Sequence, residues 1–337
     1  MRILLTGGLG YIGSHCAVQL CDSGYEVIIV DNLSNSNLTV LENIRKTANK
    51  QIDFILADIR DLDGLKKIFT EKRIDTVIHL AGLKSIPDSF EQPLDYYSVN
   101  VHGTISLLKA MSMCKVHKLV FSSSASVYGN PQYLPIDEAH PLAPNNPYSM
   151  TKLTAENLLK SLCDTSDQWK MIVLRYFNPV GAHDSLNIGE LPEKNFGNLM
   201  PNISAVAFKK KTHLNIYGNN YSTSDGTALR DFIHIMDLAD GHEAALKFLN
   251  TNKSKFEVIN LGTGISHSVL EVVNTYQKIS GLNIKNKKIP PRAGDIDISY
   301  ADVKKAKKKL DWKSKRDLSD ICNSEYLWKK KYYKKAI

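Results

Sequence analysis

The chain has 337 residues, of which 43% are hydrophobic and 23% are charged, as in ordinary globular proteins. No apolar run approaches the roughly 20 residues that cross a bilayer, which argues against a membrane-spanning protein. The formal net charge of +8 comes largely from lysines near the C-terminal end, without a nucleic-acid-binding motif among them, so we interpret them as a solvated helix face. Five scattered cysteines without metal-ligand spacing indicate reduced thiols, no metal site and a cytoplasmic protein.

The first thirty residues have the pattern of a dinucleotide-binding unit: strand, glycine turn, helix, strand. These elements are the strand 1–6, the glycines Gly7, Gly10 and Gly13, the helix 14–23 and the strand 26–30. Glycines let the backbone approach a pyrophosphate, and the helix N-terminus offers it free N–H groups. Asp31 follows the second strand, where a carboxylate accepts bonds from the adenosine ribose and repels a 2′-phosphate. The pattern therefore predicts NAD rather than NADP.

The alternation of strands and helices continues to about residue 180. We expect strands over 52–57, 75–80, 118–122 and 169–176, and helices over 61–72 (capped by Asp61), over 93–114 and from Pro147. Repeated strand–helix units with right-handed crossovers build a parallel sheet covered on both faces. The fold class is therefore α/β, with a Rossmann-type doubly wound parallel sheet as an NAD-binding domain over residues 1–180.

Beyond residue 180 the pattern loosens into a smaller C-terminal lobe, over residues 181–337, that binds the substrate. Strand and helix segments of this part can return to the first domain. The expected elements are helices over 198–211, 237–249 (capped by Asp237) and 268–280 (capped by Ser268), strands over 214–217 and 258–261, and basic helices at the end.

One pair of residues carries the candidate chemistry. Tyr148 and Lys152 are four residues apart, so they share one face of the helix that starts at Pro147. A nearby ammonium lowers the pKa of a phenol from about 10, which would let the tyrosine act as a general base. Only this pair follows a strand that ends at Ser124, at the carboxyl edge of the predicted sheet. Two other pairs share the spacing: Tyr300 with Lys304, and Tyr326 with Lys330.

A set of motifs along nearly the whole chain resembles the extended branch of the short-chain dehydrogenase/reductase family, and within it the family of UDP-glucose (UDP-galactose) 4-epimerases. The motifs are TGGLGYIGSH (6–15), DNL (31–33), HLAGLK (79–84), FSSSASVYG (121–129), PYSMTK (147–152), LRYFNPVGAH (174–183), DGT (225–227), RDFIHIMDLADGH (230–242) and NLGTG (260–264).

The resemblance implies a role for each matching residue. Tyr148 is the catalytic base, Lys152 holds the nicotinamide ribose, and Ser124 bridges the sugar 4-hydroxyl and the tyrosine. The implied NAD-binding residues are Gly7, Gly10, Tyr11, Ile12, Gly13, Asp31, Asn32, Leu33, Ser34, Asn35, Ser36, Asp58, Ile59, Leu80, Ala81, Gly82, Leu83, Lys84, Tyr148, Lys152 and Phe177. The implied substrate-binding residues are Lys84, Ser124, Tyr148, Asn178, Asn198, Leu199, Asn215, Ile216, Tyr217, Arg230, Arg292, Asp295 and Ser299.

The implied reaction is a reversible C4 epimerisation of UDP-glucose and UDP-galactose through a 4-keto sugar, as part of galactose and carbohydrate metabolism. NAD is regenerated in each cycle and need not leave. The resemblance also implies a cytoplasmic homodimer formed through two helices of the NAD-binding domain, one of them carrying Tyr148.

The sequence departs from the family pattern at three positions. Val99 replaces an asparagine expected near the cofactor, which predicts weaker NAD binding, and Pro87 follows the Lys84 segment unexpectedly. Ser299 stands where members restricted to glucose and galactose carry a tyrosine. A serine leaves room for an N-acetyl group, so we predict UDP-N-acetylglucosamine (UDP-GlcNAc) and its galactose epimer as further substrates. A shift of the loop by one residue would let Tyr300 fill that space instead.

Three other functions compete with this interpretation. A nucleotide-sugar 4,6-dehydratase of the same family commonly needs an Asp-Glu pair just after the catalytic serine, but residues 125–127 are Ala-Ser-Val. A reducing enzyme with NADP conflicts with Asp31. A non-catalytic NAD-sensing protein often lacks the tyrosine or the lysine, and both are present.

Overall fold

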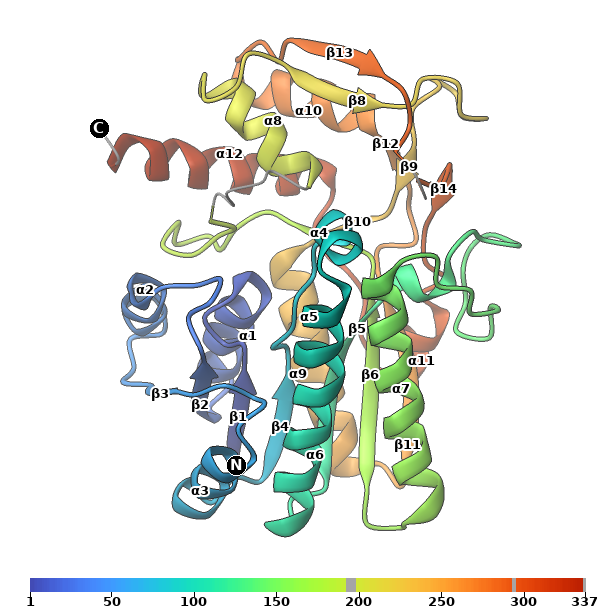
Figure 1. The fold of residues 1–337 in the computed structure, drawn as a ribbon. Helices are drawn as coiled ribbons and strands as arrows, with labels where there is room; N and C mark the ends of the chain where they lie inside the picture. Colours follow the sequence, from blue (N-terminus) through green and yellow to red (C-terminus); the bar gives the residue numbers. More distant parts are fainter. Residues whose placement is uncertain (192–197, 293–294, 336–337) are drawn as a thin grey trace.

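A computed structural model describes residues 1–191, 198–292 and 295–335. Its centre is a parallel seven-stranded sheet with the strand order β11-β6-β5-β4-β1-β2-β3 (Figure 1). These strands are β1 (Arg2–Thr6), β2 (Glu26–Asp31), β3 (Asp53–Leu56), β4 (Thr76–His79), β5 (Lys118–Ser124), β6 (Lys170–Tyr176) and β11 (Phe256–Leu261). Because all pairs are parallel, the carboxyl ends of the strands lie along one edge, where ligands bind in such sheets.

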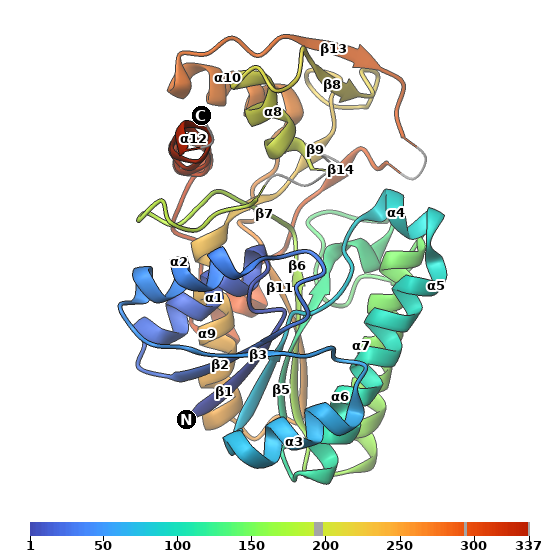
Figure 2. The same ribbon diagram turned by 60° about the vertical axis from the view of Figure 1, so that its left-hand side comes forward.

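Helices cover both faces of this sheet, and each face has its own apolar core (Figure 2). One layer consists of α1 (Tyr11–Asp22), α2 (Leu38–Ala48), α9 (Ile235–Thr251) and α11 (Lys304–Leu310). The other consists of α3 (Leu62–Lys72), α5 (Pro93–Tyr96), a π-helical turn (Tyr97–His102), α6 (Gly103–Met113) and α7 (Pro147–Thr165). The short helices α4 (Ile86–Glu91) and η2 (Ala125–Tyr128) lie beyond the carboxyl ends of β4 and β5. The chain thus has the predicted Rossmann-type doubly wound fold.

A smaller lobe sits above the carboxyl edge of the sheet (Figure 1). It has its own core among α8 (Leu199–Ala207), α10 (Val269–Ser280) and α12 (Leu318–Lys335). Three small sheets complete it: β7 (Asn178–Val180) with β10 (Phe232–His234), β8 (Leu214–Tyr217) with β13 (Asn286–Ile289), and β9 (Leu229–Arg230) between β12 (His267–Ser268) and β14 (Ile298–Ser299). Among the described residues, no helix is both long and apolar enough to cross a membrane.

Several predicted helix starts can be compared with the structure. Asp61 accepts a hydrogen bond from the Gly64 N–H at the start of α3, and Ser268 forms a capping box with Glu271 at the start of α10, as predicted. The prediction for Asp237 was wrong, because α9 begins two residues earlier with His234 as its cap.

The second half of the chain returns to the first domain through two elements. Helix α9 packs against α1, and β11 pairs with β6 at the edge of the large sheet. The strand predicted over 214–217 is β8. The two- and three-residue strands of the smaller lobe were not predicted, because strands this short carry almost no periodic signal. Helix α2 was not predicted either.

Candidate active site

The glycine turn after β1 places no side chain between the protein backbone and an approaching ligand. Gly7 has φ +68°, and a Cβ there would lie 2.6 Å from the Ala81 nitrogen. A Cβ at Gly13 would lie 2.2 Å from the Gly7 carbonyl oxygen, so α1 can pack this closely only without a side chain. No side chain caps the N-terminus of α1 at Gly10. This uncapped helix end behind a glycine turn fits the pyrophosphate of a dinucleotide.

Asp31 organises the loop that follows β2. Its Oδ1 accepts hydrogen bonds from the Leu33 N–H and the Ser36 hydroxyl, both at 2.9 Å, and its Oδ2 accepts one from the Leu9 N–H at 3.1 Å. The carboxylate is therefore fixed between the glycine turn and the 31–36 loop. A fixed negative charge there suits ribose hydroxyls and disfavours a 2′-phosphate, as predicted for NAD.

Asp58 marks the same edge after β3. Hydrogen bonds from the Arg60 guanidinium hold the pKa of its carboxyl well below the usual value, and Asn32 donates to Oδ2 at 3.1 Å. Asp58 thus joins the loop after β3 to the loop after β2. The other predicted NAD residues occupy the same edge: Tyr11 and Ile12 in the first turn of α1, Asn32 to Ser36 after β2, Ile59 after β3, Leu80 to Lys84 after β4, and Phe177 after β6.

Asn100 fixes the loop after β4 over the helix α7, which carries Tyr148 and Lys152. Its side chain accepts from the Leu83 N–H at 2.8 Å and donates to the Leu83 carbonyl and to the Thr151 hydroxyl, both at 3.0 Å. A Cβ at Gly82 would lie 3.7 Å from the Lys152 ammonium, so this loop passes directly above that group. The π-helical turn around Asn100 interrupts the single helix predicted over 93–114.

Ser124, Tyr148 and Lys152 come together at the carboxyl ends of β5 and β6. Helix α7 begins with Pro147 and is capped by Asn146, whose side chain accepts from the Ser149 N–H. The Lys152 ammonium donates to the Ser122 carbonyl at 2.7 Å and lies 6.0 Å from the centre of the Tyr148 ring. The hydroxyl of Ser124 acts on the tyrosine in the direction that lowers its pKa, and it accepts hydrogen bonds from the N–H and the hydroxyl of Ser126 at 3.2 and 2.9 Å. The arrangement provides a phenol, a hydroxyl and a buried cation at one point.

The electrostatics of this cluster differ from the sequence-based prediction. Burial raises the pKa of Tyr148 above its usual value, while hydrogen bonding with Ser124 and the charge of Lys84 act in the lowering direction. The prediction that the pKa of Tyr148 would be lowered was therefore wrong for the protein alone, because loss of solvation outweighs both effects. Burial also lowers the pKa of Lys152 to about 8, and the nearby carboxylate of Glu156 opposes that change.

A buried ion pair under the catalytic residues was missed by the sequence analysis. Glu156 lies one turn beyond Lys152 and pairs with Arg175 of β6, with 2.6 Å between the Arg175 Nη2 and the Glu156 Oε2. Ser123 donates a hydrogen bond to the same carboxylate. The i, i+4, i+8 spacing of Tyr148, Lys152 and Glu156 on one helix face was the signal that could have revealed it.

The other predicted substrate residues belong to the smaller lobe, across the boundary between this lobe and the carboxyl edge of the sheet, called the crevice below. Arg230 is partly buried, and its Nη1 donates to the Leu229 carbonyl at 2.9 Å. Arg292 pairs with Asp295 at 3.0 Å, and its guanidinium carbon lies 4.6 Å from the centre of the Tyr217 ring. The remaining members are Asn178 in β7, Asn198 and Leu199 at the start of α8, and Asn215 and Ile216 in β8. Residues 293 and 294, between Arg292 and Asp295, lie outside the described residues.

Ser299 is buried in β14, in register with Arg230 of the parallel strand β9. Residues in register on neighbouring strands project from the same face, so Ser299 shares its face with this arginine. Tyr300 follows Ser299, and its carbonyl accepts a hydrogen bond from the Ile136 N–H at 2.9 Å.

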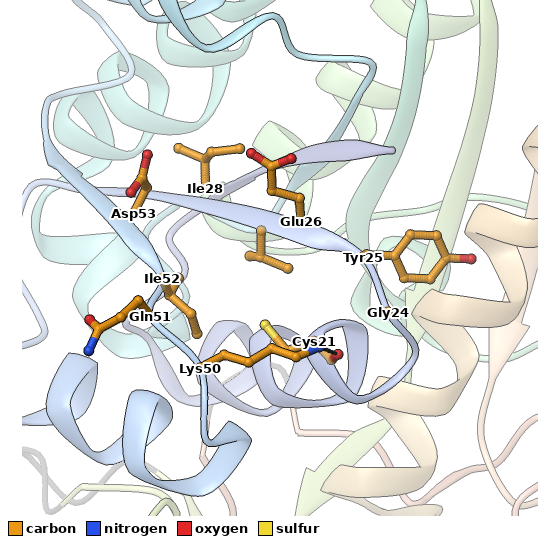
Figure 3. A pocket seen from close by; sticks show the side chains of 10 residues that line it. Cys21, Gly24, Tyr25, Glu26, Ile28, Lys50, Gln51, Ile52 and Asp53 are labelled. Carbon is orange, nitrogen blue, oxygen red and sulfur yellow. Dashed lines mark hydrogen bonds between the residues drawn. The ribbon is translucent and has the colours of Figure 1, made fainter.

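Other features of the described residues lie away from this site. A cavity of about 370 Å³ opens at the amino ends of β2 and β3, the edge opposite to the glycine turn, next to Cys21, Glu26 and Lys50 (Figure 3). Within the described ranges, no group of three or more His, Cys, Asp or Glu residues could hold a metal ion.

The fold and the site define a nicotinamide-dinucleotide-binding protein with the Tyr-Lys-Ser constellation of short-chain dehydrogenases/reductases. A family model described as GDP-mannose 4,6 dehydratase matches residues 4–324, and the chain belongs to this broad family. Within it, the chain belongs to the UDP-glucose 4-epimerases. It is 46% identical to the UDP-glucose 4-epimerase of Bacillus subtilis over 97% of this chain and 96% of the relative.

Two solved structures support this assignment. A UDP-glucose 4-epimerase from Stenotrophomonas maltophila with bound NAD and formylated UDP-arabinopyranose superposes with a TM-score of 0.97, at 42% identity and 99% coverage of both chains. A UDP-Glc/GlcNAc 4-epimerase from Campylobacter jejuni superposes with a TM-score of 0.85, at 35% identity, covering 98% of this chain and 99% of the other.

Proposed function

We propose that this protein interconverts UDP-glucose and UDP-galactose by epimerisation at C4, using tightly bound NAD. The observation that carries the proposal is the joint position of Ser124, Tyr148 and Lys152 beside a glycine turn that fits a dinucleotide. The sequence similarity to UDP-glucose 4-epimerases extends over almost the whole chain, which supports the same activity.

The chain's own residues would hold NAD and handle one proton. The uncapped end of α1 and the glycine turn would take the pyrophosphate, and Asp31 would take the adenosine ribose. When bound, NAD supplies the hydride acceptor and donor at C4 of the sugar, and its positive ring favours the deprotonated phenol. Tyr148 would remove the proton of the 4-hydroxyl and return it after the 4-keto sugar has turned, with Ser124 orienting the hydroxyl.

The smaller lobe would hold the uridine diphosphate. Arg230 and Arg292 can each pair with phosphate oxygens, with bidentate geometry available. Asn178, Asn198 and residues 215–217 would contact the nucleotide, which leaves the sugar itself loosely held. A firm grip on the nucleotide and a loose one on the sugar is what the rotation of the 4-keto sugar requires.

We also propose a division of the chain into two domains at residue 180, with α9 and β11 returned to the NAD-binding domain.

The purified protein tests this function directly. It should convert UDP-galactose to UDP-glucose without added NAD, and denaturation should release NAD in about one equivalent per chain. Production of a 4-keto-6-deoxy sugar would instead support a dehydratase, against which Ala125 and Ser126 argue by lacking a carboxylate. Absence of any turnover together with bound NAD would support an NAD-sensing protein.

A second substrate class is favoured by one observation. Ser299 is small, buried and on the same face as Arg230, so an N-acetyl group at C2 of the sugar has room there. We expect UDP-N-acetylglucosamine to be epimerised alongside UDP-galactose. Normal turnover of UDP-galactose with none of UDP-N-acetylglucosamine would contradict this, and would favour Tyr300 as the wall of the sugar pocket.

We further infer a homodimer that forms through α7 and the neighbouring helical segment of α5, the π-helical turn and α6. Leu94 in α5, Tyr97 in the π-helical turn and Met150 in α7 are exposed, with Leu94 at 83%, and these elements pack against one another. An apolar group of this kind favours burial against a second copy. Light scattering should give twice the chain mass, and the variant Leu94→Glu should give the monomer.

We also propose that the protein is cytoplasmic, where its cysteines stay free.

A further inference from the structure

Glu190 lies where the two lobes meet, between the loop after β4 and the start of α8. Its side chain is nearly buried, with 7% of its surface exposed. One carboxylate oxygen, Oε1, accepts from the Lys84 ammonium at 3.2 Å and from the Asn198 amide at 3.4 Å. Lys84 belongs to the loop after β4 in the NAD-binding domain, and Asn198 is the N-cap residue of α8 in the smaller lobe, where its side chain makes no hydrogen bond to the helix. A single acceptor therefore connects both sides of the crevice.

The backbone of Glu190 is held independently of its side chain. The Trp328 indole N–H of α12 donates to the Glu190 carbonyl at 3.3 Å, and the Lys329 ammonium donates to the same oxygen. A Cβ at Gly189 would lie 2.7 Å from atoms of the Trp328 ring, so the chain packs flat on this ring. The carboxylate is thus presented from a fixed position.

Helix α12 anchors this segment through a second buried charge pair. Lys329 and Glu325 are each 1% exposed and lie 3.8 Å apart. Glu325 also accepts from the Ser204 hydroxyl of α8 at 3.2 Å. The C-terminal helix therefore ties the Glu190 backbone to the same helix, α8, whose N-cap residue is Asn198.

We propose that Glu190 is a positioning residue whose carboxylate holds Lys84 and Asn198 in one arrangement across the crevice. The proposal rests on the epimerase function proposed above and adds a residue to its site. Through Lys84, Glu190 acts on the chemistry, because the charge of that ammonium acts on the Tyr148 phenol. Through Asn198, Glu190 affects how tightly the smaller lobe binds the nucleotide.

Two substitutions separate these effects. Glu190→Gln removes the charge that holds Lys84 but leaves an amide oxygen that can accept from Asn198. Glu190→Leu removes both interactions. The charge of Lys84 acts to lower the pKa of Tyr148, so a displacement of Lys84 away from the phenol raises that pKa and moves the acidic limb of the activity profile to higher pH.

The matched control is Glu243→Gln. Glu243 is a buried carboxylate that pairs with Lys247 at 2.7 Å and accepts from the Gln19 amide at 2.8 Å, which are the same kinds of partner. It joins α9 to α1, away from the crevice. A role in stability alone predicts that the Glu190 and Glu243 variants behave alike.

The measurements are kcat and KM with UDP-galactose, their pH profiles, and the dissociation constant of UDP by calorimetry. For Glu190→Gln we expect kcat/KM to fall roughly tenfold, a size usual for coupled neighbours, with the UDP affinity kept. In a Lys84→Met background the same substitution should have little further effect. For Glu190→Leu the UDP affinity should also weaken by about threefold to tenfold, the effect of one lost hydrogen bond.

Three results would overturn the proposal: a Glu190→Gln enzyme like the Glu243→Gln control, an undiminished effect of Glu190→Gln in the Lys84→Met background, or an unchanged UDP affinity in Glu190→Leu. If Glu190→Leu does not fold, the comparison of Glu190→Gln in the wild-type and Lys84→Met backgrounds still tests the proposal. If the wild-type protein does not turn over UDP-galactose, the proposed function fails, whereas the UDP affinities still test the connection to Asn198.

Discussion

The two sides of the crevice are built differently. On the side of the proposed catalytic residues, Lys152, Glu156 and Arg175 are at most 6% exposed and are fixed by hydrogen bonds to β5 and β6. On the nucleotide side, Asn215 and Arg292 are exposed and stand on short strands and loops. A catalytic cluster buried in a rigid sheet suits a cofactor that stays, and exposed groups on short elements suit a nucleotide that enters and leaves in each cycle. The substitutions below separate the two sides.

The largest effect is expected on the catalytic side, from Tyr148→Phe. Loss of the phenol hydroxyl removes the general base, so kcat should fall roughly 10²- to 10⁴-fold, while UDP binding stays unchanged. Stopped assays over long incubation give kcat, and calorimetry gives the UDP affinity. Tyr326→Phe is the control, because this tyrosine also has a lysine four residues later but packs against Phe208 and Tyr276 in the core of the smaller lobe. Full activity of Tyr148→Phe would mean that the catalytic cluster is misassigned.

Ser299→Tyr tests the boundary between the two sides. A ring placed beside C2 of the sugar should lower kcat/KM for UDP-N-acetylglucosamine by roughly 10- to 100-fold, a range consistent with overpacking, and leave UDP-galactose nearly unaffected. Both rates are measured on one preparation. An equal loss with both sugars would show a damaged site and not a specificity wall.

On the nucleotide side, Arg292→Leu should raise KM for UDP-galactose about tenfold, the usual value of a charge-assisted hydrogen bond, with kcat nearly kept. Arg2→Leu is the control, since Arg2 forms a similar ion pair with Glu26 at the opposite edge of the sheet. A fall in kcat with an unchanged KM would place Arg292 with the catalytic cluster instead.

The smallest effect concerns the anchoring of the smaller lobe. Burial raises the pKa of Glu325 to about 7, above its usual value. A folded pKa above the unfolded one contributes stability that is full below the unfolded pKa of about 4.3 and is lost as pH rises through about 7. The melting temperature of the wild type relative to Glu325→Gln should therefore decrease from pH 5 to pH 8. The opposite trend would show that Lys329 keeps this carboxylate ionised in the folded protein.

The sequence predicted the first domain much better than the second. The strand–turn–helix pattern around Gly7 to Asp31 and the alternation up to Tyr176 gave the parallel sheet, because long buried strands and capped helices carry strong periodic signals. In the smaller lobe, β7, β9, β10, β12 and β14 have two or three residues each and were not predicted. Their pairing depends on tertiary contacts that no local pattern encodes.

The site was predicted from motifs, and its supporting contacts were not. The positions of Ser124, Tyr148 and Lys152 follow from spacing and the sheet edge. The pKa of Tyr148 did not follow, because burial depends on tertiary packing such as the contact between the Tyr96 and Tyr148 rings. The Glu156–Arg175 pair was also missed: helical spacing places Glu156 on the face of Lys152, but its partner Arg175 is brought there only by the fold. Glu190 was missed because only the fold brings it to Lys84.

The central claim is that one NAD stays bound while a UDP-sugar passes its C4 hydride out and back. It is tested with UDP-galactose carrying deuterium at C4, incubated with the purified protein and no added NAD. The product should be UDP-glucose that keeps the deuterium at C4, as seen by mass spectrometry and NMR. A product that has lost the label to solvent, or a reaction that needs added NAD in proportion to turnover, would contradict the account.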